Sequence, residues 1–599
     1  MNYNKCKDAP PMDTVARIRA IYRDLKLDIR HSVEKRIDGI YSATAIDVNN
    51  GWSTSGKGTD EAYCLASAYG ESIEHLCSHM AYDTGALPRE ANAYLEFIRY
   101  PDEIQIDIGC IPGYAPVVWK DMLDAYNRVG KPAADEKQVV DFWKRYLGSD
   151  KTSFAPYYSV RRRRVVSLPE EIISKLCGSN GGGAGNSAQE AIGHGLDEIL
   201  ERYVKHEIYT KQMTPPEISK EYIRKNYHEL FDLIQRIERG YDMKIVVKDA
   251  SMGVGYTVVS VLMVNQKHQQ YMINFGAHPK FEIALERCLT EMFQFYTGKH
   301  CEYAHKAMIP WRCEEEGKAE GARNWISLLR DDTGVVPDSY FAGTPSWSFI
   351  PWKTYEAYSN HTGMNEQIQG ILRNTDKDIY IRNVSFLGFP VYRVYIPELS
   401  TSFLPLDERM IECAKACRAI SKVIRESMGA GLSTEQAAVL KEFAQDHEYS
   451  FGHFIFRNTH EDIIDAFCIA LVLDAGSREK AYALLRQKEN AFCRCAVKDD
   501  ELREKGVDER TRNELLVLFF GNEEAEFAAC WRKERVFEAL MVWNEKMRRS
   551  RAPMQAHTMT GDICELHKRV KRKMMENIPD PHSTQALLWE QYDLSQHQI

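Results

Sequence analysis

The alternation of apolar and polar residues divides the chain into two regions of different character. Up to about residue 405, short runs rich in Val, Ile and Tyr alternate with helix-like stretches, and polar residues, Gly or Pro bound each run, as is typical of β-strands. We expect strands within four segments: residues 243–251, 256–264, 270–279 and 378–397. From about residue 406 the apolar residues recur at helical spacing among many Glu, Lys, Arg and Ala. The pattern therefore predicts an α+β region of mixed sheets, residues 1–405, followed by an all-α domain, residues 406–599. Core packing between helices explains the apolar pattern of this second region, and a docking surface for a partner is the alternative that analogy suggests.

The composition favours a globular protein of the cytoplasm. Of the 599 residues, 44% are hydrophobic and 27% are charged, which is enough to form sizeable cores in two or more units. We find no run of about 18 apolar residues and no apolar secretion signal, so we expect neither a membrane span nor export. The fifteen cysteines are then expected to be free thiols. A net charge of -9 argues against a general DNA or RNA binder, because such binding needs a basic surface.

An internal repeat links two glycine-rich segments. Residues 55–76 and 182–203 align without gaps, and each copy has a Gly-x-Gly loop, a polar helix start and a Glu-x-x-Glu pair. The alignment matches the following pairs: Gly56 with Gly183, Gly58 with Gly185, Glu71 with Glu198, and Glu74 with Glu201. Free backbone N–H groups at a helix start attract phosphate, so a duplicated phosphate and metal site would have this form. Chance alignment of two amphipathic helices is the alternative.

The predicted helices carry acidic residues on one face without lysines between them. In the second copy this face contains Glu190, His194, Asp197, Glu198, Glu201 and Lys205, and in the first it contains Ser67, Glu71, Glu74, His75 and Ser78. A third helix places Arg287, Glu291 and Gln294 in the same way. Solvated faces usually interleave Lys with Glu, because like charges at i,i+4 cost a few tenths of a kcal/mol. A solvated polar face explains any single helix, but the set favours a hard cation such as Mg²⁺ held by carboxylates.

The sequence matches neither the P-loop nor the dinucleotide-binding loop, and its one run of arginines needs no functional explanation. Gly58 stands where a P-loop needs Ser or Thr, and the segment at residues 183–188 does not follow directly on a predicted strand, as a dinucleotide-binding loop would. The run at residues 161–164 consists of four arginines, which we interpret as solvated surface. If a nucleotide binds, it does so by another device.

These blocks resemble the signatures of the YcaO family, and most closely those of its stand-alone enterobacterial member. The pattern Ser67-x-x-x-Glu71-x-x-Glu74 is similar to the family's S-x-x-x-E-x-x-E-R, with His75 in place of the arginine. Residues 179–204 resemble the second block. Residues 275–294 resemble the third, and residues 7–18 resemble the family's opening. The resemblance covers residues 1–405 and is weaker over the helical tail.

The resemblance implies an ATP- and Mg²⁺-dependent enzyme that activates a backbone amide by phosphorylating its oxygen. It implies these metal ligands: Glu71, Glu74, Glu190, Glu198, Glu201 and Glu291. It implies these nucleotide contacts: Lys7, Thr14, Ser67, Asn186, Glu190, Arg202, Arg287 and Gln294. It implies these catalytic residues: Glu198, Glu201, Arg202 and Arg287.

Several departures from the family narrow the expected function. His75 removes a permanent cation, and Gly183 replaces a serine of the enterobacterial member. Azoline-forming members end in a proline-rich tail, whereas this sequence ends WEQYDLSQHQI, and we find no fused domain for binding a peptide leader.

These departures favour an accessory factor, acting as a homodimer on a peptide or protein substrate, for RimO-dependent β-methylthiolation of a small-subunit ribosomal protein. One alternative is a RiPP enzyme that forms thioamide, amidine or azoline in a ribosomally made peptide. The other is a non-catalytic scaffold regulated by nucleotide.

Overall fold

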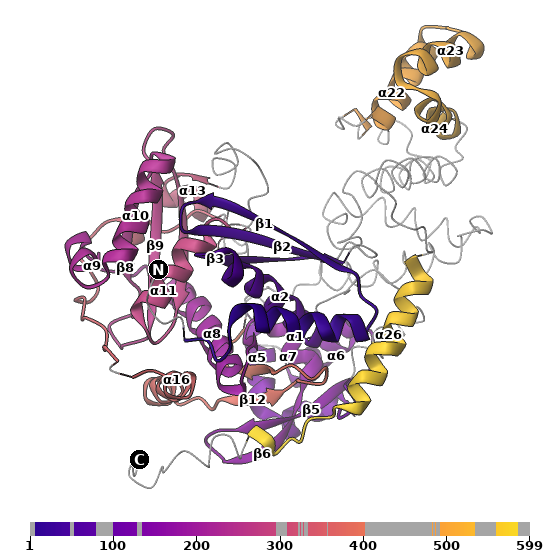
Figure 1. Ribbon diagram of the computed structural model, residues 1–599. Helices are drawn as coiled ribbons and strands as arrows, with labels where there is room; N and C mark the ends of the chain where they lie inside the picture. Colours follow the sequence, from indigo (N-terminus) through magenta and orange to yellow (C-terminus); the bar gives the residue numbers. More distant parts are fainter. Residues whose placement is uncertain are drawn as a thin grey trace.

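Three antiparallel sheets form the N-terminal two thirds of the molecule (Figure 1). The computed structural model describes residues 6–47, 53–78, 100–127, 135–294, 308–320, 324, 328, 334–355, 357–401, 482, 485–486, 491–532 and 559–584. The first sheet has the order β1-β2-β3 and consists of β1 (Ile29–Ile37), β2 (Ile40–Asp47) and β3 (Ser53–Gly58). The second has the order β11-β10-β9-β8 and consists of β8 (Lys244–Asp249), β9 (Val258–Asn265), β10 (Gln270–Ala277) and β11 (Ile309–Pro310).

The third sheet is assembled from distant parts of the chain. Its order is β4-β5-β12-β13-β7, with β6 paired to β5, and its strands are β4 (Ile104–Asp107), β5 (Lys151–Ser159), β6 (Arg164–Pro169), β7 (Gly182–Ala184), β12 (Tyr380–Asn383) and β13 (Val391–Tyr395). Each of the four segments predicted to hold strands contains β8, β9, β10 or the β12–β13 pair. The α+β prediction is therefore confirmed for this region.

Helices cover these sheets and extend to the C-terminal region. Those of the N-terminal region are α1 (Pro11–Asp24), α2 (Glu61–Cys77), α4 (Ile111–Tyr114), α5 (Pro116–Asn127), α6 (Glu136–Leu147), α7 (Glu170–Cys177), α8 (Ala188–Thr210), α9 (Lys220–Asn226), α10 (His228–Tyr241), α11 (Phe281–Glu291), α13 (Glu314–Glu320), α15 (Asp338–Phe341) and α16 (Asn360–Asn374), with a 3₁₀ turn at Ile108–Cys110. Those of the C-terminal region are α22 (Ala491–Glu504), α23 (Glu509–Phe520), α24 (Asn522–Arg532) and α26 (Met559–Glu576). The predicted boundary near residue 405 falls within residues 402–481, which lie outside the described residues, so the division into two domains stays a prediction.

The glycines of the internal repeat are required by close packing between a strand and its helix. A Cβ atom on Gly56 would lie 2.3 Å from the carbonyl oxygen of Cys64, eight residues further on. A Cβ atom on Gly183 would lie 2.1 Å from the carbonyl oxygen of Ala191, again eight residues further on. Only a residue without a side chain permits this approach. The two copies therefore share one geometry, and their alignment is not a chance match of amphipathic helices.

The structure adds a third copy that the sequence comparison did not find. A Cβ atom on Gly276 of β10 would lie 2.5 Å from the carbonyl oxygen of Ala284, which is also eight residues further on, in α11. The three glycines pair across antiparallel ladders with Ala43, Tyr392 and Val259, respectively. Each helix also contacts the glycine-bearing strand of the next copy: α2 contacts β7, α8 contacts β10, and α11 contacts β3. The three strand–helix units thus close into a cycle.

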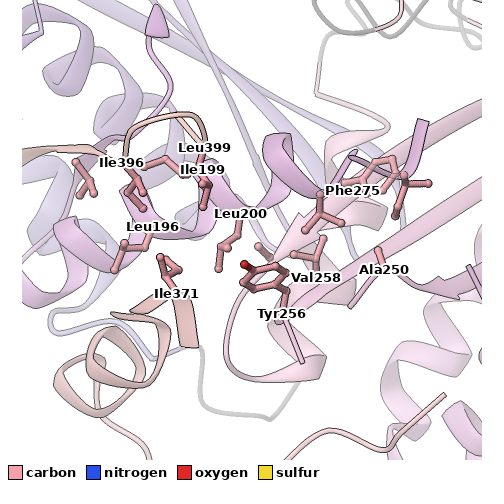
Figure 2. Close-up of a cluster of buried hydrophobic side chains, with 14 of the residues drawn as sticks. Leu196, Ile199, Leu200, Ala250, Tyr256, Val258, Phe275, Ile371, Ile396 and Leu399 are labelled. Carbon is pink, nitrogen blue, oxygen red and sulfur yellow. The ribbon is translucent and has the colours of Figure 1, made fainter. Parts of the chain in front are cut away.

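One face of helix α8 is buried in a hydrophobic core, and the opposite face is turned toward the interior of the cycle of three strand–helix units. Its residues Leu196, Ile199 and Leu200 pack in a hydrophobic cluster with Val258 and Phe275 of the second sheet (Figure 2). These three residues of α8 are at most 2% exposed. Burial of such apolar side chains fixes the rotation of the helix about its axis, because the opposite face cannot be buried in the same core. Glu190, Glu198 and Glu201 of α8 are therefore directed to the centre of the cycle.

Two C-terminal parts of the chain are described. Helices α22, α23 and α24 contact one another around their own core, in which Phe527 and Trp531 are fully buried. Helix α26 instead packs against the N-terminal core, where Val570 is 0% exposed and Met574 1% exposed. At this contact Arg569 Nε donates to the carbonyl oxygen of Leu25 at 2.8 Å. The end of the chain therefore contributes to the core that α1 and α2 share.

Three further expectations have an outcome in the fold. The four arginines of the run at residues 161–164 are all exposed, as expected, and Arg161 also donates to the carbonyl oxygens of Leu372 and Thr375 at the C-terminal end of α16. The ten cysteines whose side chains the structure describes are all free. No helix in the described part of the chain is both long enough and apolar enough to cross a membrane.

Candidate functional site

The interior of the three-unit cycle is a cavity of about 470 Å³. Residues from α1, α2, α8 and α11 line it, together with the segment that precedes α1. All of the sequence-predicted site residues line this one cavity: Lys7, Thr14, Ser67, Glu71, Glu74, Asn186, Glu190, Glu198, Glu201, Arg202, Arg287, Glu291 and Gln294. Segments almost 290 residues apart in the chain are thus brought together.

The repeat explains why these residues meet. Equivalent positions of the three helices carry Glu71, Glu198 and Glu291, and three residues further on they carry Glu74, Glu201 and Gln294. Each helix is fixed by its glycine contact, so each presents the same face to the cavity. The result is a ring of five carboxyl groups and one amide, which we call the carboxylate ring.

The chain before α1 lies against the start of α8. The ammonium of Lys7 is 3.1 Å from Glu190 Oε1 and 2.8 Å from His194 Nε2. His194 Nδ1 lies 2.9 Å from the carbonyl oxygen of Ala184, so Nδ1 carries the proton and Nε2 accepts from Lys7. Burial and the Lys7 ammonium lower the pKa of His194 to about 3, which keeps the ring neutral and able to accept. His194 therefore orients Lys7 toward the cavity wall.

Glu190 holds the same segment by its second oxygen. That oxygen, Oε2, accepts from the backbone N–H of Asp8 at 3.1 Å and from that of Asn186 at 3.2 Å. Thr14 Oγ1 in turn donates to Asn186 Oδ1 at 2.8 Å. Burial would raise the pKa of Glu190, but the attraction of Lys7 and these hydrogen bonds outweigh it, and the pKa is lowered to about 2. Glu190 is thus ionised and already partnered.

The carboxyl groups of the ring repel one another. Burial, and the charge of Glu198 after it, raises the pKa of Glu71 to about 7, although Lys57 acts against this rise. Burial together with Glu198 and Glu71 raises the pKa of Glu74 well above its ordinary value. The pKa of Glu201 is also raised, mainly by burial. Buried, repelling carboxyl groups whose pKa values are all raised indicate a site that lacks positive charge.

Basic side chains neutralise part of the negative charge of the carboxylate ring. Arg202 Nη2 lies 2.7 Å from Glu198 Oε1 on the same helix. Lys57 of β3 forms an ion pair with Glu291, and burial, with Arg287 after it, lowers the pKa of Lys57 to about 8. These pairs leave Glu74 and Glu201 without an ion-pair partner among the residues that the structure describes.

Gln294 bridges the carboxylate ring and the first sheet. Its Nε2 donates to the carbonyl oxygen of Ser55 at 2.9 Å and lies 3.3 Å from Glu71 Oε2. In the equivalent place of the next copy, a Cβ atom on Gly182 would lie 2.7 Å from Glu74 Oε1. The same contact between a ring residue and the next strand therefore occurs twice.

A buried carboxylate, held by a hydrogen bond on its other side, forms an ion pair with Arg287. Arg287 Nη1 lies 3.7 Å from Asp197 Oδ2, and Gln367 of α16 donates to Asp197 Oδ1. Asp197 is 1% exposed and Gln367 4% exposed. Burial raises the pKa of Asp197 to about 7, and Arg287 acts against this rise. Asp197 therefore fixes the direction in which Arg287 enters the cavity.

The sequence alone assigns no role to four residues that shape this site: Lys57, His194, Asp197 and Gln367. His194 and Asp197 were recognised only as members of the polar face of α8. Lys57 could have been noticed from its position between the two glycines of the Gly-x-Gly loop. No sequence feature points to Gln367, because α16 follows the repeat by about seventy residues. Of the noted departures, His75 lines the cavity, and Gly183 stands where backbone contact leaves no room for a serine side chain.

The residues present fit a nucleotide with magnesium better than a metal alone. In the described part of the chain, no three His, Cys, Asp or Glu side chains are grouped closely enough to hold a metal ion. Magnesium commonly uses one or two carboxylates together with the phosphates of a nucleotide, so such a group is not required. Two buried polar atoms of cavity residues, Arg287 Nε and Gln294 Oε1, have no hydrogen-bond partner among the described residues. A bound polar ligand would supply both the phosphates and such partners.

Comparison with known proteins identifies the family. The family described as YcaO cyclodehydratase, ATP- and Mg²⁺-binding, matches residues 55–400, which include all three copies of the repeat. The chain belongs to the YcaO family. ATP and Mg²⁺ are the cofactors of this family. The carboxylate ring is where the Mg²⁺ would be held, and the basic residues of the cavity face the same space.

Relatives among curated proteins match over part of their length. An uncharacterized protein of Haemophilus influenzae is 29% identical over 369 residues, which are 59% of this chain and 58% of that protein. The ribosomal protein S12 methylthiotransferase accessory factor YcaO of Escherichia coli K12 is 27% identical over 402 residues, which are 66% of this chain and 65% of that protein. The matches therefore span less than two thirds of each relative.

Similar solved structures are more distant. A heterocyclase in complex with substrate and cofactor has 15% identity and a TM-score of 0.45, covering 66% of this chain and 52% of that one. YcaO from Methanopyrus kandleri, bound with AMPPCP and Mg²⁺, has 17% identity and a TM-score of 0.40, covering 65% of this chain and 91% of that one.

Proposed function

We propose that this YcaO protein uses ATP and Mg²⁺ to activate a backbone amide of a peptide or protein substrate. The observation that carries the proposal is the cavity in which three sequence blocks meet, with carboxyl groups whose pKa values are raised by burial and by one another's charge. ATP, when bound, supplies the phosphoryl group that converts a poor leaving group, the amide oxygen, into a good one. The protein's own residues position this reaction and balance its charge.

Each group of cavity residues has a distinct role in the proposal. Glu71, Glu74, Glu190, Glu198, Glu201 and Glu291 are the proposed metal ligands. Ser67, Thr14, Asn186 and Gln294 are proposed to hydrogen-bond the nucleotide. Lys7, Arg202 and Arg287 offset the negative charge that develops during phosphoryl transfer, because fixed cations in a water-poor cavity need no reorganisation. Asp197 keeps Arg287 in place for this task.

For the biological role, we propose an accessory factor for β-methylthiolation of a small-subunit ribosomal protein. The name of the Escherichia coli relative supports it, because that protein is an accessory factor of a ribosomal protein S12 methylthiotransferase. A RimO-like enzyme and the ribosomal protein are then the proposed partners, and a homodimer is the proposed assembly. The division into residues 1–405 and 406–599, the second part docking a partner, belongs to this proposal.

The test removes single charges from the ring. The variants Glu198→Gln and Glu201→Gln keep the side-chain shape but lose the charge that holds Mg²⁺. We expect each to weaken binding of a non-hydrolysable ATP analogue in the presence of Mg²⁺ by at least about tenfold and to abolish phosphate release. The matched control is Glu207→Gln on the same helix, since Glu207 lies outside the cavity and pairs with Lys211. Calorimetry and a phosphate-release assay measure the two quantities.

The outcomes separate the classes of function. Unchanged Mg²⁺–nucleotide binding in both ring variants contradicts the proposed site. Wild-type protein that binds nucleotide but releases no phosphate, even with peptides and the ribosomal protein, indicates a nucleotide-regulated scaffold. Phosphate release with a ribosomally made precursor peptide but not with the ribosomal protein indicates the RiPP-modifying alternative.

A further inference from the structure

Lys57 places a positive charge inside the carboxylate ring. It lies near the end of β3, lines the cavity, and its side chain is only 18% exposed. Its ammonium forms an ion pair with Glu291, and the acidic groups Glu201 and Glu71 also attract it. Arg287 is the positive group that acts on it most strongly. Lys57 is thus surrounded by residues that the proposed function assigns to Mg²⁺ and phosphate.

The fold does not require a lysine at this position. The repeat aligns Lys57 with Ala184 in the second copy and Ala277 in the third, each directly after the glycine that packs on its helix. Both alanines are buried in the same strand position as Lys57. A methyl side chain is therefore compatible with the packing at this strand position. The strand of the first copy does not need the long basic side chain of Lys57 in order to fold.

An ammonium and a divalent cation compete for the same carboxylate. While Lys57 is paired with Glu291, that carboxylate is neutralised and cannot bind a metal ion with full strength. The ion pair is partly shielded from water, since Glu291 is only 28% exposed, so solvent screens it less than a surface pair. A divalent cation has to displace Lys57 before it can use Glu291.

We infer that Lys57 is an internal cation that occupies the Glu291 end of the carboxylate ring and opposes the binding of a divalent metal ion without nucleotide. This inference rests on the proposed function, because it assumes that the ring is the metal site. A nucleotide brings phosphates that attract the displaced ammonium, so metal and nucleotide bind together more favourably than the metal does alone. The consequence is a site that selects the metal–nucleotide complex over the free metal ion.

The experiment measures Mn²⁺ alone, by electron paramagnetic resonance or calorimetry, on the full chain without nucleotide. Lys57→Ala reproduces the residue of the other two copies and is therefore compatible with the fold. We expect it to bind Mn²⁺ roughly three- to tenfold more tightly than the wild type, because the competing charge is removed. Lys57→Met, which keeps the length of the side chain, should give the same gain, and Lys57→Arg should give none.

The matched control is Lys35→Met in the same sheet, because Lys35 is exposed and pairs with Asp38 away from the cavity. Its Mn²⁺ affinity should equal that of the wild type. In the double variant Lys57→Ala/Glu291→Gln the gain should disappear, since the released carboxylate is absent. Unchanged or weaker Mn²⁺ binding by both Lys57→Ala and Lys57→Met overturns the inference. Such a result leaves the proposed function standing if Glu198→Gln still removes Mg²⁺–nucleotide binding, whereas insensitivity to Glu198→Gln removes the basis of both.

Discussion

Charges in the cavity fall into two groups of residues. Glu190 is ion-paired with Lys7, and Glu198 is ion-paired with Arg202. Glu74, by contrast, has no ion-pair partner among the described residues, and its pKa is raised well above its ordinary value. Because the pKa values of Glu71 and Glu74 are raised, protons and a cation compete for these carboxyl groups. Metal binding should therefore release protons.

The pH dependence of stability is a direct consequence for Glu71. Its pKa is about 7 in the folded protein against an ordinary value of 4.5, so the folded state binds the proton more tightly than the unfolded state. The stabilisation is complete below pH 4.5 and is lost as the pH rises through 7, with a slope of at most about 1.4 kcal/mol per pH unit from this group. We expect the metal- and nucleotide-free protein to melt at a lower temperature at pH 8 than at pH 5.5, and Glu71→Gln to reduce that difference.

Glu207→Gln provides the comparison for this measurement. Hydrogen bonding to His206, together with Lys211, lowers the pKa of Glu207 to about 2, so this group stays ionised over the whole range tested. Its replacement should leave the difference between pH 5.5 and pH 8 unchanged. Scanning calorimetry in the presence of a chelator gives the melting temperatures. An equal pH dependence in Glu71→Gln and in the wild type contradicts the assignment to Glu71.

Among secondary-structure elements, the strand–helix contact is the unit from which the site is built. Gly183→Ala would place a Cβ atom 2.1 Å from the carbonyl oxygen of Ala191, so β7 and α8 must move apart. We expect a loss of about 1–3 kcal/mol in stability and weaker nucleotide binding, because α8 carries four of the proposed metal ligands and contacts. Gly193→Ala on the same helix meets nothing within 4 Å and should instead stabilise by about 0.5–1 kcal/mol. Chemical unfolding measures the change in the free energy of unfolding for both variants. Equal changes in the two variants would contradict the packing role of Gly183.

The sequence predicted two of the three strand–helix units, for a physical reason. In the first two copies the helix starts with a side-chain cap, from Asp60 and from Ser187, after a Gly-x-Gly loop. The third copy has a single glycine, Gly276, and Lys280 at the start of its helix gives no side-chain cap. Only the backbone contact is common to all three, and a contact between a strand and a helix leaves no motif in the sequence. The periodicity of α11 predicted its polar face, but it did not show that α11 is the structural equivalent of α2 and α8 in a third copy of the repeat.

For the molecule as a whole, the sequence predicted the members of the site better than their partners. Glutamates at helical spacing, supported by the family resemblance, identified the residues that the cavity brings together. The sequence did not reveal the ion pair between Lys57 and Glu291 or the hydrogen bond between Gln367 and Asp197. Each of these contacts joins two elements whose relative positions only the tertiary structure fixes. Long-range contacts of this kind depend on how all three sheets pack, so no local pattern encodes them.

The end of the chain bears on the site through α1. Met574 of α26 is 1% exposed and fills the core shared by α1 and α2, and Lys573 lies 3.1 Å from Asp24 at the end of α1. Met574→Ala should cost about 2–4 kcal/mol through the cavity it leaves, whereas Met575→Ala should change stability by less than about 0.5 kcal/mol, since Met575 is 56% exposed.

Thr14, which lines the cavity proposed to bind the nucleotide, belongs to α1, so loosening the contact with α26 should also weaken binding of the ATP analogue. Thermal unfolding with and without Mg²⁺ and the analogue measures both effects in the same experiment. If Met574→Ala lowers the melting temperature of the free protein but leaves the shift caused by the ligand unchanged, α26 supports the core without influence on the cavity. If the shift also shrinks, a change more than 550 residues from Thr14 in the chain acts on the cavity through the core that α1 and α2 share, because both helices contribute residues to the cavity wall.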